Sequence, residues 1–213
     1  MQTILQKIRE EKIISIIRSE SISDLVEVVG ALYDGGIQLV EITMNTPNAL
    51  KGIEKIQQKY PDMLVGAGTV LDQETARLAI LSGAAFLLAP TLHEESIALA
   101  NRYNVPLFPG VLTPTEIVKA YESGAQAVKI FPIRSFGSQY IKDIKGPLPH
   151  VNMIPVGGVD TDNVAEYLNN GSFAVGIGSS LVNDLLISQK NFSEISRRAK
   201  RLVEAVPKNA NER

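Results

Sequence analysis

A regular alternation of β-rich runs and amphipathic helical segments is the feature that most limits what this chain can fold into. Alternating strands and helices give parallel strands joined by right-handed crossovers. Eight such units in 213 residues predict a closed (β/α)8 TIM barrel, with an open doubly wound sheet as the alternative. We expect the strands at 13–18, 37–43, 64–69, 85–89, 105–109, 125–131, 152–156 and 173–177.

The segments between these runs carry the signals of helix ends. Asp72, Thr113-Pro114 and Thr46-Pro47 are typical of helix starts. Glycines such as Gly124 follow the expected helices, where a left-handed backbone conformation often ends a helix. We expect helices, among others, at 24–33, 48–59, 73–81 and 115–122.

The sequence predicts one domain with a short N-terminal helix. Ile4, Leu5 and Ile8 share one helical face ahead of the first strand. No linker or low-complexity segment interrupts the strands and helices after it. We therefore expect a single barrel domain at 1–206 and a polar C-terminal tail at 207–213.

The composition excludes several classes of protein. The net charge is −2 with both signs mixed along the chain, so the basic stripe of a nucleic-acid-binding protein is missing. There is no cysteine, and His93 and His150 are far apart, which is not the pattern of a metal site. The N-terminal segment has no apolar signal core, and the longest apolar runs are too short to cross a bilayer. We expect a cytoplasmic protein without a metal, a membrane partner or a nucleic-acid partner.

Lys129 is the most conspicuous candidate for a catalytic residue. It lies in an apolar run that ends at Pro132, and strand alternation places it on the face of Ala127 and Phe131. Burial disfavours the charged ammonium, and a neutral lysine amine is a nucleophile toward ketones. Taken alone, Lys129 could instead extend its amine to solvent from the strand end.

Arg18, Glu41 and Thr69 also stand at the carboxyl ends of expected strands, where TIM barrels place their active sites. Strand alternation places each side chain on the same face as the residues two and four positions earlier. These are Ile16 and Ile14 for Arg18, Leu39 and Ile37 for Glu41, and Ala67 and Val65 for Thr69. Glu41 is unusual in an apolar strand, and we interpret it as an acid/base group whose pKa is raised by burial. A structural ion pair is the alternative. A lysine and a carboxylate in one pocket are the minimum set for Schiff-base chemistry.

Glycine-rich loops follow the seventh and eighth expected strands. Gly157 and Gly158 come after the seventh, while Gly178 and Ser179 come after the eighth, just before an expected helix. In barrels these two loops commonly bind a phosphate through backbone N–H groups, although ordinary turn glycines are the alternative. The segment at 66–69 lacks the G-x-G-x-x-G spacing, so we expect no nicotinamide cofactor.

Six short motifs follow one another in order between about residues 12 and 185. They are Val40-Glu41-Ile42-Thr43, Val65-Gly66-Ala67-Gly68-Thr69-Val70, Pro109-Gly110, Val128-Lys129-Ile130-Phe131-Pro132, Lys145-Gly146-Pro147 and Pro155-Val156-Gly157-Gly158. Together they make the chain resemble the 2-keto-3-deoxy-6-phosphogluconate (KDPG) and 4-hydroxy-2-oxoglutarate (KHG) aldolase family.

The resemblance implies a class I aldolase without metal or cofactor, usually a homotrimer. It would cleave KDPG, an intermediate of the Entner–Doudoroff pathway, to pyruvate and glyceraldehyde 3-phosphate. By this likeness Lys129 would form the Schiff base and Glu41 would move protons. The substrate would contact Thr69 at its carboxylate, Arg18 at its polar end, Pro90 and Phe131 along an apolar wall, and Gly157, Gly158, Gly178 and Ser179 at its phosphate.

The chain departs from the commonest family pattern at three positions. Asn45 stands where many members have an arginine for the pyruvate carboxylate, and Val156 stands where many have a threonine. Arg134 occupies a position where small residues are more usual, and it either restores the missing cation or lies in solvent. A KHG aldolase that releases pyruvate and glyoxylate is therefore one alternative, and a non-catalytic sugar-phosphate-binding barrel is another.

Overall fold

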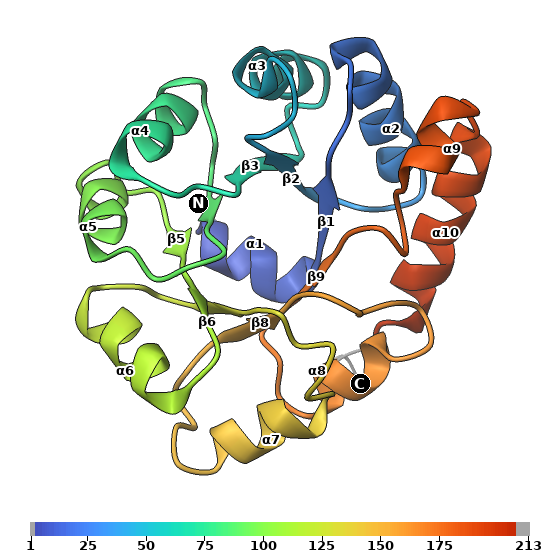
Figure 1. Ribbon diagram of the computed structural model, residues 1–213. Helices are drawn as coiled ribbons and strands as arrows, with labels where there is room; N and C mark the ends of the chain where they lie inside the picture. Colours follow the sequence, from blue (N-terminus) through green and yellow to red (C-terminus); the bar gives the residue numbers. More distant parts are fainter. Residues whose placement is uncertain (1–2, 208–213) are drawn as a thin grey trace.

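Helices surround a curled set of parallel strands in the computed structural model, which describes residues 3–207 (Figure 1). The strands are β1 (Ile13–Ile17), β2 (Leu39–Thr43), β3 (Leu64–Gly68), β4 (Leu87–Leu88), β5 (Leu107–Phe108), β6 (Gly110–Val111), β7 (Val128–Ile130), β8 (Met153–Pro155) and β9 (Val175–Ile177). The helices are α1 (Ile4–Glu11), α2 (Ile22–Asp34), α3 (Ala49–Lys59), α4 (Gln73–Leu81), α5 (Glu94–Arg102), α6 (Pro114–Glu122), α7 (Gln139–Lys145), α8 (Val164–Asn169), α9 (Asp184–Ser188) and α10 (Phe192–Ala205). Strands and helices alternate, so the predicted α/β class is confirmed.

The strands form two parallel segments of curled sheet. One segment has six strands in the order β5-β4-β3-β2-β1-β9, and the other has three in the order β6-β7-β8. Only Pro109 separates β5 from β6 along the chain. At the other edge, an isolated parallel bridge joins Val156, just after β8, to Gly176 in β9. The two segments are therefore adjacent at both edges.

Each of the eight expected runs contains a strand, but the observed strands are shorter. The run expected at 105–109 contains only β5, which ends before Pro109, because a proline has no N–H to donate to a neighbouring strand. The carbonyl of Pro109 accepts instead from the Lys129 N–H at 2.9 Å. The chain then continues as β6, where Gly110 pairs with Lys129. The break at Pro109 thus helps to set the register of the strand that carries the candidate lysine.

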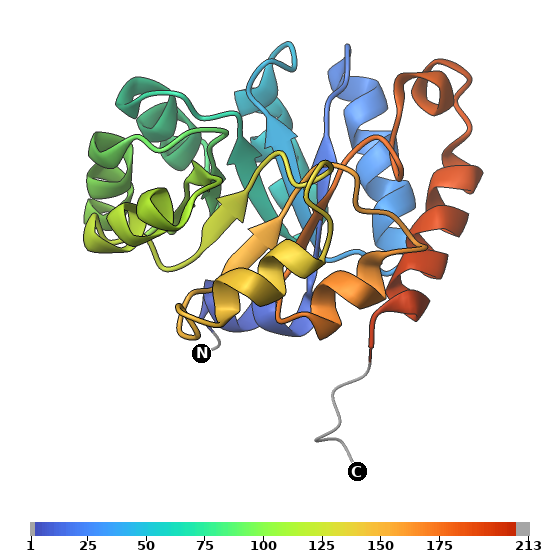
Figure 2. The ribbon, with the colours of Figure 1, turned by 60° about the horizontal axis from the view of Figure 1, so that its bottom comes forward.

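Two apolar clusters lie on opposite faces of the strands. The outer cluster packs between strands and helices, and its strand residues include Ile13, Ile17, Val40, Ile42, Val65, Ala67, Val128 and Ile130. The inner cluster comprises Ile8, Ile14, Leu39, Phe86, Leu88, Phe108, Ala127, Ile154, Val156, Phe173 and Ala174. Helix α1 lies across one end of the strands (Figure 2) and contributes Ile8, which is fully buried. Apolar side chains therefore fill the amino end of the inner space.

Strand alternation predicts most of the inward-facing positions. Ala127 belongs to the inner cluster, whereas Val128 and Ile130 belong to the outer cluster, so the predicted inward direction of Lys129 is confirmed. The prediction is wrong for Ile37, which lies in the outer cluster. The reason is that β2 begins only at Leu39, and alternation does not extend beyond the strand.

Helix starts follow the predicted chemistry at two of three positions. Asp72 and Thr113 each accept a hydrogen bond from a first-turn N–H, so they cap α4 and α6 as expected. The start expected at Thr46-Pro47 is wrong, because α3 begins after Asn48. Thr46 instead connects two loops, since its Oγ1 accepts the N–H of Ser19 at 3.3 Å.

The described part of the chain ends at Pro207. Residues 208–213, most of the tail expected at 207–213, lie outside it. Between residues 3 and 207, no helix has the length and apolar character needed to cross a membrane. Over the same range, no three histidine, aspartate or glutamate side chains are placed to hold a metal ion.

Candidate active site

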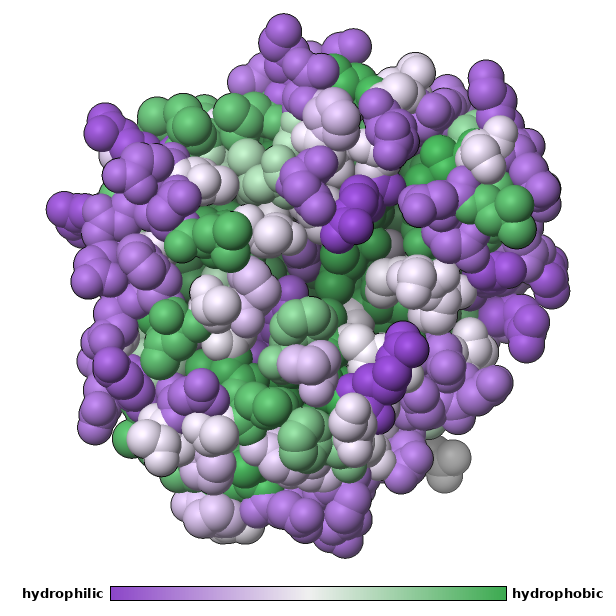
Figure 3. Space-filling view, viewed as in Figure 1, coloured by the Kyte–Doolittle hydropathy of each residue, from purple (hydrophilic) through white to green (hydrophobic). Residues whose placement is uncertain are grey.

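A pocket of about 610 Å³ opens at the carboxyl ends of the strands, and Figure 3 shows the hollow near the centre of the molecule. Its lining comes from several strands and from the loops that follow them. All the residues expected at the site line this pocket: Arg18, Glu41, Thr69, Pro90, Lys129, Phe131, Gly157, Gly158, Gly178 and Ser179. The fold thus brings together residues that lie up to 161 positions apart, from Arg18 to Ser179.

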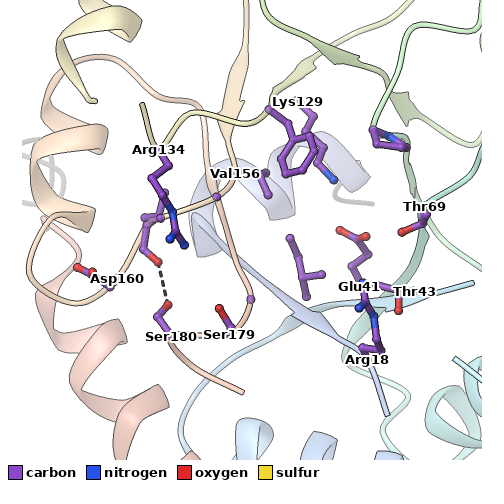
Figure 4. Close-up of a pocket in the computed structure, with 17 residues that line it drawn as sticks. Arg18, Glu41, Thr43, Thr69, Lys129, Arg134, Val156, Asp160, Ser179 and Ser180 are labelled. Atoms are coloured by element: carbon purple, nitrogen blue, oxygen red, sulfur yellow. Dashed lines mark hydrogen bonds between the residues drawn. The ribbon is translucent and has the colours of Figure 1, made fainter. Parts of the chain in front are cut away.

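Strand β7 directs the side chain of Lys129 into this pocket (Figure 4). Parallel pairing fixes the backbone of Lys129 between Gly110 in β6 and Ile154 in β8. The residue is only 6% exposed, and its Nζ lies 5.0 Å from the centre of the Phe131 ring. The amine therefore ends inside the pocket, against an aromatic wall, and not on the outer surface of the molecule.

Glu41 is buried at the same pocket, on the strand β2. It is 1% exposed, and its Oε2 has no hydrogen-bond partner. Loss of hydration raises the pKa of the Glu41 carboxyl, and the positive charge of Lys129 offsets part of that rise. Among residues 3–207, Glu41 belongs to no ion pair, which removes the structural alternative. A carboxyl with a raised pKa can both donate and accept a proton near neutral pH.

Gly68 provides the space that the Glu41 carboxylate occupies. A Cβ at position 68 would lie 1.4 Å from Oε1 of Glu41, and one at position 66 would lie 2.3 Å from the ring of Phe86. Strand β3 pairs directly with β2 and sets Gly68 opposite Thr43. The glycines of the segment 66–69 thus serve close packing inside the strands, a role that their sequence spacing alone does not reveal.

Thr69 reaches the pocket by a different route from the one that alternation predicts. Val65 and Ala67, expected on its face, lie in the outer cluster, so the predicted shared face is wrong. Strand β3 ends at Gly68, and Thr69 has a φ of 59°. This left-handed conformation is rare for a β-branched residue. The turn brings Thr69 to the pocket, and strain of this kind is typical of functional sites.

The glycine loops form the far end of the pocket. Gly157 and Gly158 have φ values of 98° and 87°, a backbone conformation that glycine adopts readily. Within residues 3–207, neither glycine donates its backbone N–H to a protein acceptor. These two N–H groups are therefore available to an anion.

The expected helix directly after Gly178 is absent. The N–H groups of Leu181 and Val182 donate to the carbonyl of Gly178 at 2.9 and 3.0 Å, which makes a single turn. Helix α9 begins only at Asp184 and has five residues. The phosphate site expected here therefore lacks a helix N-terminus in contact with Gly178, and loop N–H groups are the candidate donors.

Thr43 shares the inward face with Glu41, as strand alternation predicts, and it lines the pocket, although sequence reasoning assigned it no role. Sequence reasoning missed other lining residues. Asp160 and Ser180 also line the pocket, and they extend the two glycine loops by a few residues. Asp160 accepts from the N–H groups of Asp162 and Asn163 at 3.0 and 3.2 Å, which a linear motif does not reveal.

The three positions that depart from the family pattern have different locations. Asn45 is exposed and is not part of the pocket lining. Val156 is 5% exposed and lies between the two ends of the pocket in Figure 4. Arg134 lines the pocket at the end that holds Ser179 and Ser180. The side chain at position 45 is therefore not part of the pocket wall.

The pocket combines a lysine amine with a desolvated carboxyl at the carboxyl ends of parallel strands. An amine of this kind condenses with a ketone, and the carboxyl can move the protons that the condensation requires. Free backbone N–H groups at the far end suit an anionic group. The fold and the site together fit the class of lysine-dependent aldolases.

Comparison with known proteins agrees with this class. The family model for KDPG and KHG aldolases matches residues 4–198. The chain is 34% identical over 206 residues to the 2-dehydro-3-deoxy-phosphogluconate aldolase of Haemophilus influenzae, which covers 96% of this chain and 97% of that protein. It is 39% identical over 171 residues to the 2-dehydro-3-deoxy-6-phosphogalactonate aldolase of Escherichia coli K12, which covers 79% of this chain and 83% of that protein.

A solved structure extends the comparison to the fold. The crystal structure of KDPG aldolase from Legionella pneumophila, with pyruvate captured at low pH as a covalent carbinolamine intermediate, matches with a TM-score of 0.87. The two chains are 30% identical, and the match covers 93% of this chain and 97% of the other. The chain belongs to the KDPG and KHG aldolase family, as its sequence motifs indicate.

Proposed function

We propose that the protein is a class I aldolase that cleaves KDPG reversibly to pyruvate and glyceraldehyde 3-phosphate. One observation carries the proposal: the Lys129 amine and the unpaired, desolvated Glu41 carboxyl line the same pocket. Membership of the KDPG and KHG aldolase family supports the same reaction. The protein is then an aldehyde-lyase whose electron sink is an iminium on its own lysine.

The reaction begins at the ketone of the substrate. The amine of Lys129 attacks C2 and forms a carbinolamine. Protonated Glu41 donates its proton to the leaving hydroxyl, water departs, and an iminium remains on Lys129. Burial raises the pKa of Glu41 above its ordinary value and so favours the protonated form that this step needs.

Cleavage of the C3–C4 bond follows. Glu41, now a carboxylate, accepts the proton of the C4 hydroxyl, and the C4 oxygen becomes the aldehyde of glyceraldehyde 3-phosphate. The electron pair of the broken bond moves toward the iminium nitrogen and gives an enamine. Glu41 then returns its proton to C3. In the last step water attacks the iminium, Glu41 accepts the proton that this water gives up, and pyruvate and the free amine are released. The single carboxyl of Glu41 can act as both acid and base, because each proton that it accepts is donated in a later step.

The remaining lining residues hold the substrate at its two ends. Thr69 and Arg18 bind near the pyruvate carboxylate, while Pro90 and Phe131 form the apolar wall beside the reacting carbons. Gly157, Gly158, Gly178 and Ser179 bind the phosphate through backbone N–H groups and the serine hydroxyl. All these residues line the same pocket, which supports these substrate contacts.

Replacement of Lys129 tests the proposal. The variant Lys129→Ala should release no pyruvate from KDPG in a coupled assay, because no other group can supply the iminium. Lys129→Arg should be equally inactive, since a guanidinium remains charged at any working pH. Lys142→Ala, a change at an exposed position on α7, is the matched control. Pyruvate release by Lys129→Ala within about tenfold of the parent rate would rule out a Schiff base at this residue.

The 2-keto-3-deoxy-6-phosphogalactonate epimer is a second candidate substrate. Two observations favour it: the 39% identity to the galactonate-type aldolase and the valine at position 156, which offers no hydroxyl to the middle of the pocket. The two sugar acids differ in configuration at C4, so the wall beside that carbon must distinguish them. Comparison of kcat/KM for both phosphorylated acids and for KHG decides among the three substrates.

We infer that the two sheet segments complete a closed (β/α)8 barrel as one domain at 1–206. The bridge between Val156 and Gly176 supports closure at one edge. The hydrogen bond from the Gly110 N–H to the Thr91 carbonyl, at 3.2 Å, supports it at the other. Slow amide exchange at Gly110 and at Phe173, whose N–H donates to Met153, would support the closed form, whereas fast exchange at either would contradict it.

We propose that the protein is a homotrimer of the cytoplasm, and the family likeness and an apolar surface support the trimer. Leu71, Leu78 and Leu81 are 53%, 52% and 65% exposed, and Figure 3 shows apolar surface over α4. Exposed apolar patches commonly mark contacts between proteins. Light scattering should give three times the chain mass of 23.1 kDa, and Leu78→Glu with Leu81→Glu should lower it. A monomer mass for the parent would contradict the trimer.

A further inference from the structure

We propose that Arg134 determines specificity for a phosphorylated substrate by binding the phosphate together with the glycine N–H groups. This inference rests on the proposed function and adds a cationic side chain to it. Arg134 lies in the loop after β7. Four features support this role: its backbone anchor, the packing of its stem, the lack of a protein partner for its guanidinium among the described residues, and the charges of the pocket.

The backbone beside Arg134 is anchored to the loop that carries the glycine pair. The N–H of Ile133 donates to the carbonyl of Val156 at 3.0 Å, one residue before Gly157. Ile133 is fully buried in the outer cluster. The start of the Arg134 side chain is therefore fixed at the phosphate end of the pocket, although the residue itself is exposed.

The stem of Arg134 packs along Gly158. A Cβ at position 158 would lie 3.1 Å from Cβ, 3.2 Å from Cγ and 3.3 Å from Nε of Arg134. The absence of a side chain at Gly158 thus leaves room for both the arginine stem and an incoming anion. Since the N–H of Gly158 meets no protein acceptor among residues 3–207, the glycine and the guanidinium can approach the same phosphate.

The guanidinium of Arg134 is not engaged within the protein. Across the described residues, Arg134 takes part in no ion pair and in no hydrogen bond through its side chain. The carboxylate of Asp160 shares the pocket, but its Oδ1 accepts from two backbone N–H groups instead. Without Arg134, the charged side chain left at this end would be an aspartate, which repels a phosphate dianion.

The other two cations of the pocket lie elsewhere. Figure 4 shows Arg18 beside Glu41 and Thr43, and Lys129 next to the ring that lines the wall. Arg134 extends toward the side of Ser179 and Ser180. A guanidinium presents paired N–H donors that match the oxygens of a phosphate. Arg134 therefore offsets Asp160 and adds charge-assisted hydrogen bonds to a dianion at this end.

The variant Arg134→Met tests the inference, because methionine keeps an unbranched stem against Gly158 and removes the charge. We expect kcat/KM for KDPG to fall about 10- to 100-fold, the range for loss of a charged hydrogen bond. Cleavage of unphosphorylated 2-keto-3-deoxygluconate should stay within about twofold of the parent. Arg134→Lys should recover part of the loss, and Arg201→Met, at an exposed position on α10, should behave as the parent.

A binding measurement separates this inference from the proposed function. Inorganic phosphate, titrated by calorimetry, should bind Arg134→Met at least about fivefold more weakly than the parent, whether or not the protein cleaves any sugar acid. Reduction with borohydride in the presence of pyruvate should trap the same adduct in both proteins. Equal phosphate affinity, or an equal fall in kcat/KM for both substrates, overturns the role of Arg134. Failure to trap pyruvate in either protein overturns the aldolase assignment instead.

Discussion

At the scale of single residues, Glu41 can remain in an apolar interior because its neighbour across the sheet has no side chain. Gly68 leaves the space in which the carboxylate lies, and β2–β3 pairing places Gly66 opposite Glu41 and Gly68 opposite Thr43. The same burial raises the pKa of Glu41. A glycine and a glutamate thus act together, although only the glutamate has acid/base chemistry.

Gly68→Ala should inactivate the enzyme without unfolding it. The added Cβ would meet Oε1 of Glu41 at 1.4 Å, so the carboxylate must leave its position beside the lysine. We expect kcat for KDPG cleavage to fall about 100-fold or more, as for loss of a general acid/base. Gly146→Ala, whose Cβ would lie 3.4 Å from the nearest atom, is the control and should retain activity. A Gly68→Ala variant with parental kcat would show that the carboxylate position does not matter.

The two residues that carry the proposed chemistry, Lys129 and Glu41, could be predicted from sequence for one physical reason. Lys129 and Glu41 each interrupt an apolar run of period two, and a charge in such a run requires an explanation. The contribution of Gly68 could not be predicted, because it depends on the register between β2 and β3. Nothing in the linear spacing of 66–69 indicates which side chain fills the space.

At the scale of elements, the loops after β8 and β9 are distinct from the strands that carry the chemistry. Gly157 and Gly158 adopt positive φ, so substitutions there strain the backbone. Gly178 differs, because no atom lies within 4 Å of the Cβ that it could carry. This open space faces the pocket, which makes Gly178 the cleaner position for testing the phosphate end.

Gly178→Asp should separate phosphorylated from unphosphorylated substrates. The carboxylate would enter the phosphate end and repel a dianion, while Lys129 and Glu41 stay on other strands. We expect kcat/KM for KDPG to fall about tenfold or more, with little change for 2-keto-3-deoxygluconate. Gly178→Asn has nearly the same shape without the charge and should lose much less. Equal losses for both substrates in Gly178→Asp would mean that this loop does not bind the phosphate.

The direction of a side chain could be predicted from sequence where the residue lies inside a regular strand, and not where it lies beyond the end of the strand. Alternation correctly gives the inward face of Lys129 because β7 spans that position. It gives the wrong face for Thr69, because β3 ends one residue earlier and a φ of 59° turns the chain. It fails likewise at Ile37, which precedes β2. The exact end of a strand decides such cases, and strand ends are the least predictable boundaries.

At the scale of the whole molecule, the buried carboxyl of Glu41 opposes stability while it serves catalysis. Its pKa in the folded protein is raised above the ordinary value of 4.5 by loss of hydration. Below the unfolded pKa both states are protonated, and the full stability is present. As the pH rises toward the folded pKa, the unfolded state loses its proton first, so stability falls.

Glu41→Gln should therefore gain stability relative to the parent as the pH rises. The neutral amide removes this titration, so the difference in unfolding free energy should grow by up to about 1.4 kcal/mol per pH unit above the unfolded pKa. Urea denaturation of both proteins at pH 4 and pH 8 measures the difference, and kcat should fall in the same variant. A difference that does not change with pH would contradict a raised pKa for Glu41.

The whole reaction also relies on the iminium of Lys129 as its electron sink. Activity on KDPG should therefore persist after extended treatment with excess EDTA. The rate is measured before chelation, after chelation, and after addition of Mg²⁺ or Mn²⁺. A loss on chelation that either ion restores would point to metal-assisted cleavage and away from the lysine mechanism.

The most direct test of the central claim is the covalent mapping of pyruvate onto the chain. The protein is incubated with pyruvate, reduced with borohydride, digested and analysed by mass spectrometry. We predict a single stable secondary amine on the peptide that contains Lys129, and none in Lys129→Ala. No adduct in the parent protein, or an adduct on a different lysine, would contradict the Schiff-base assignment.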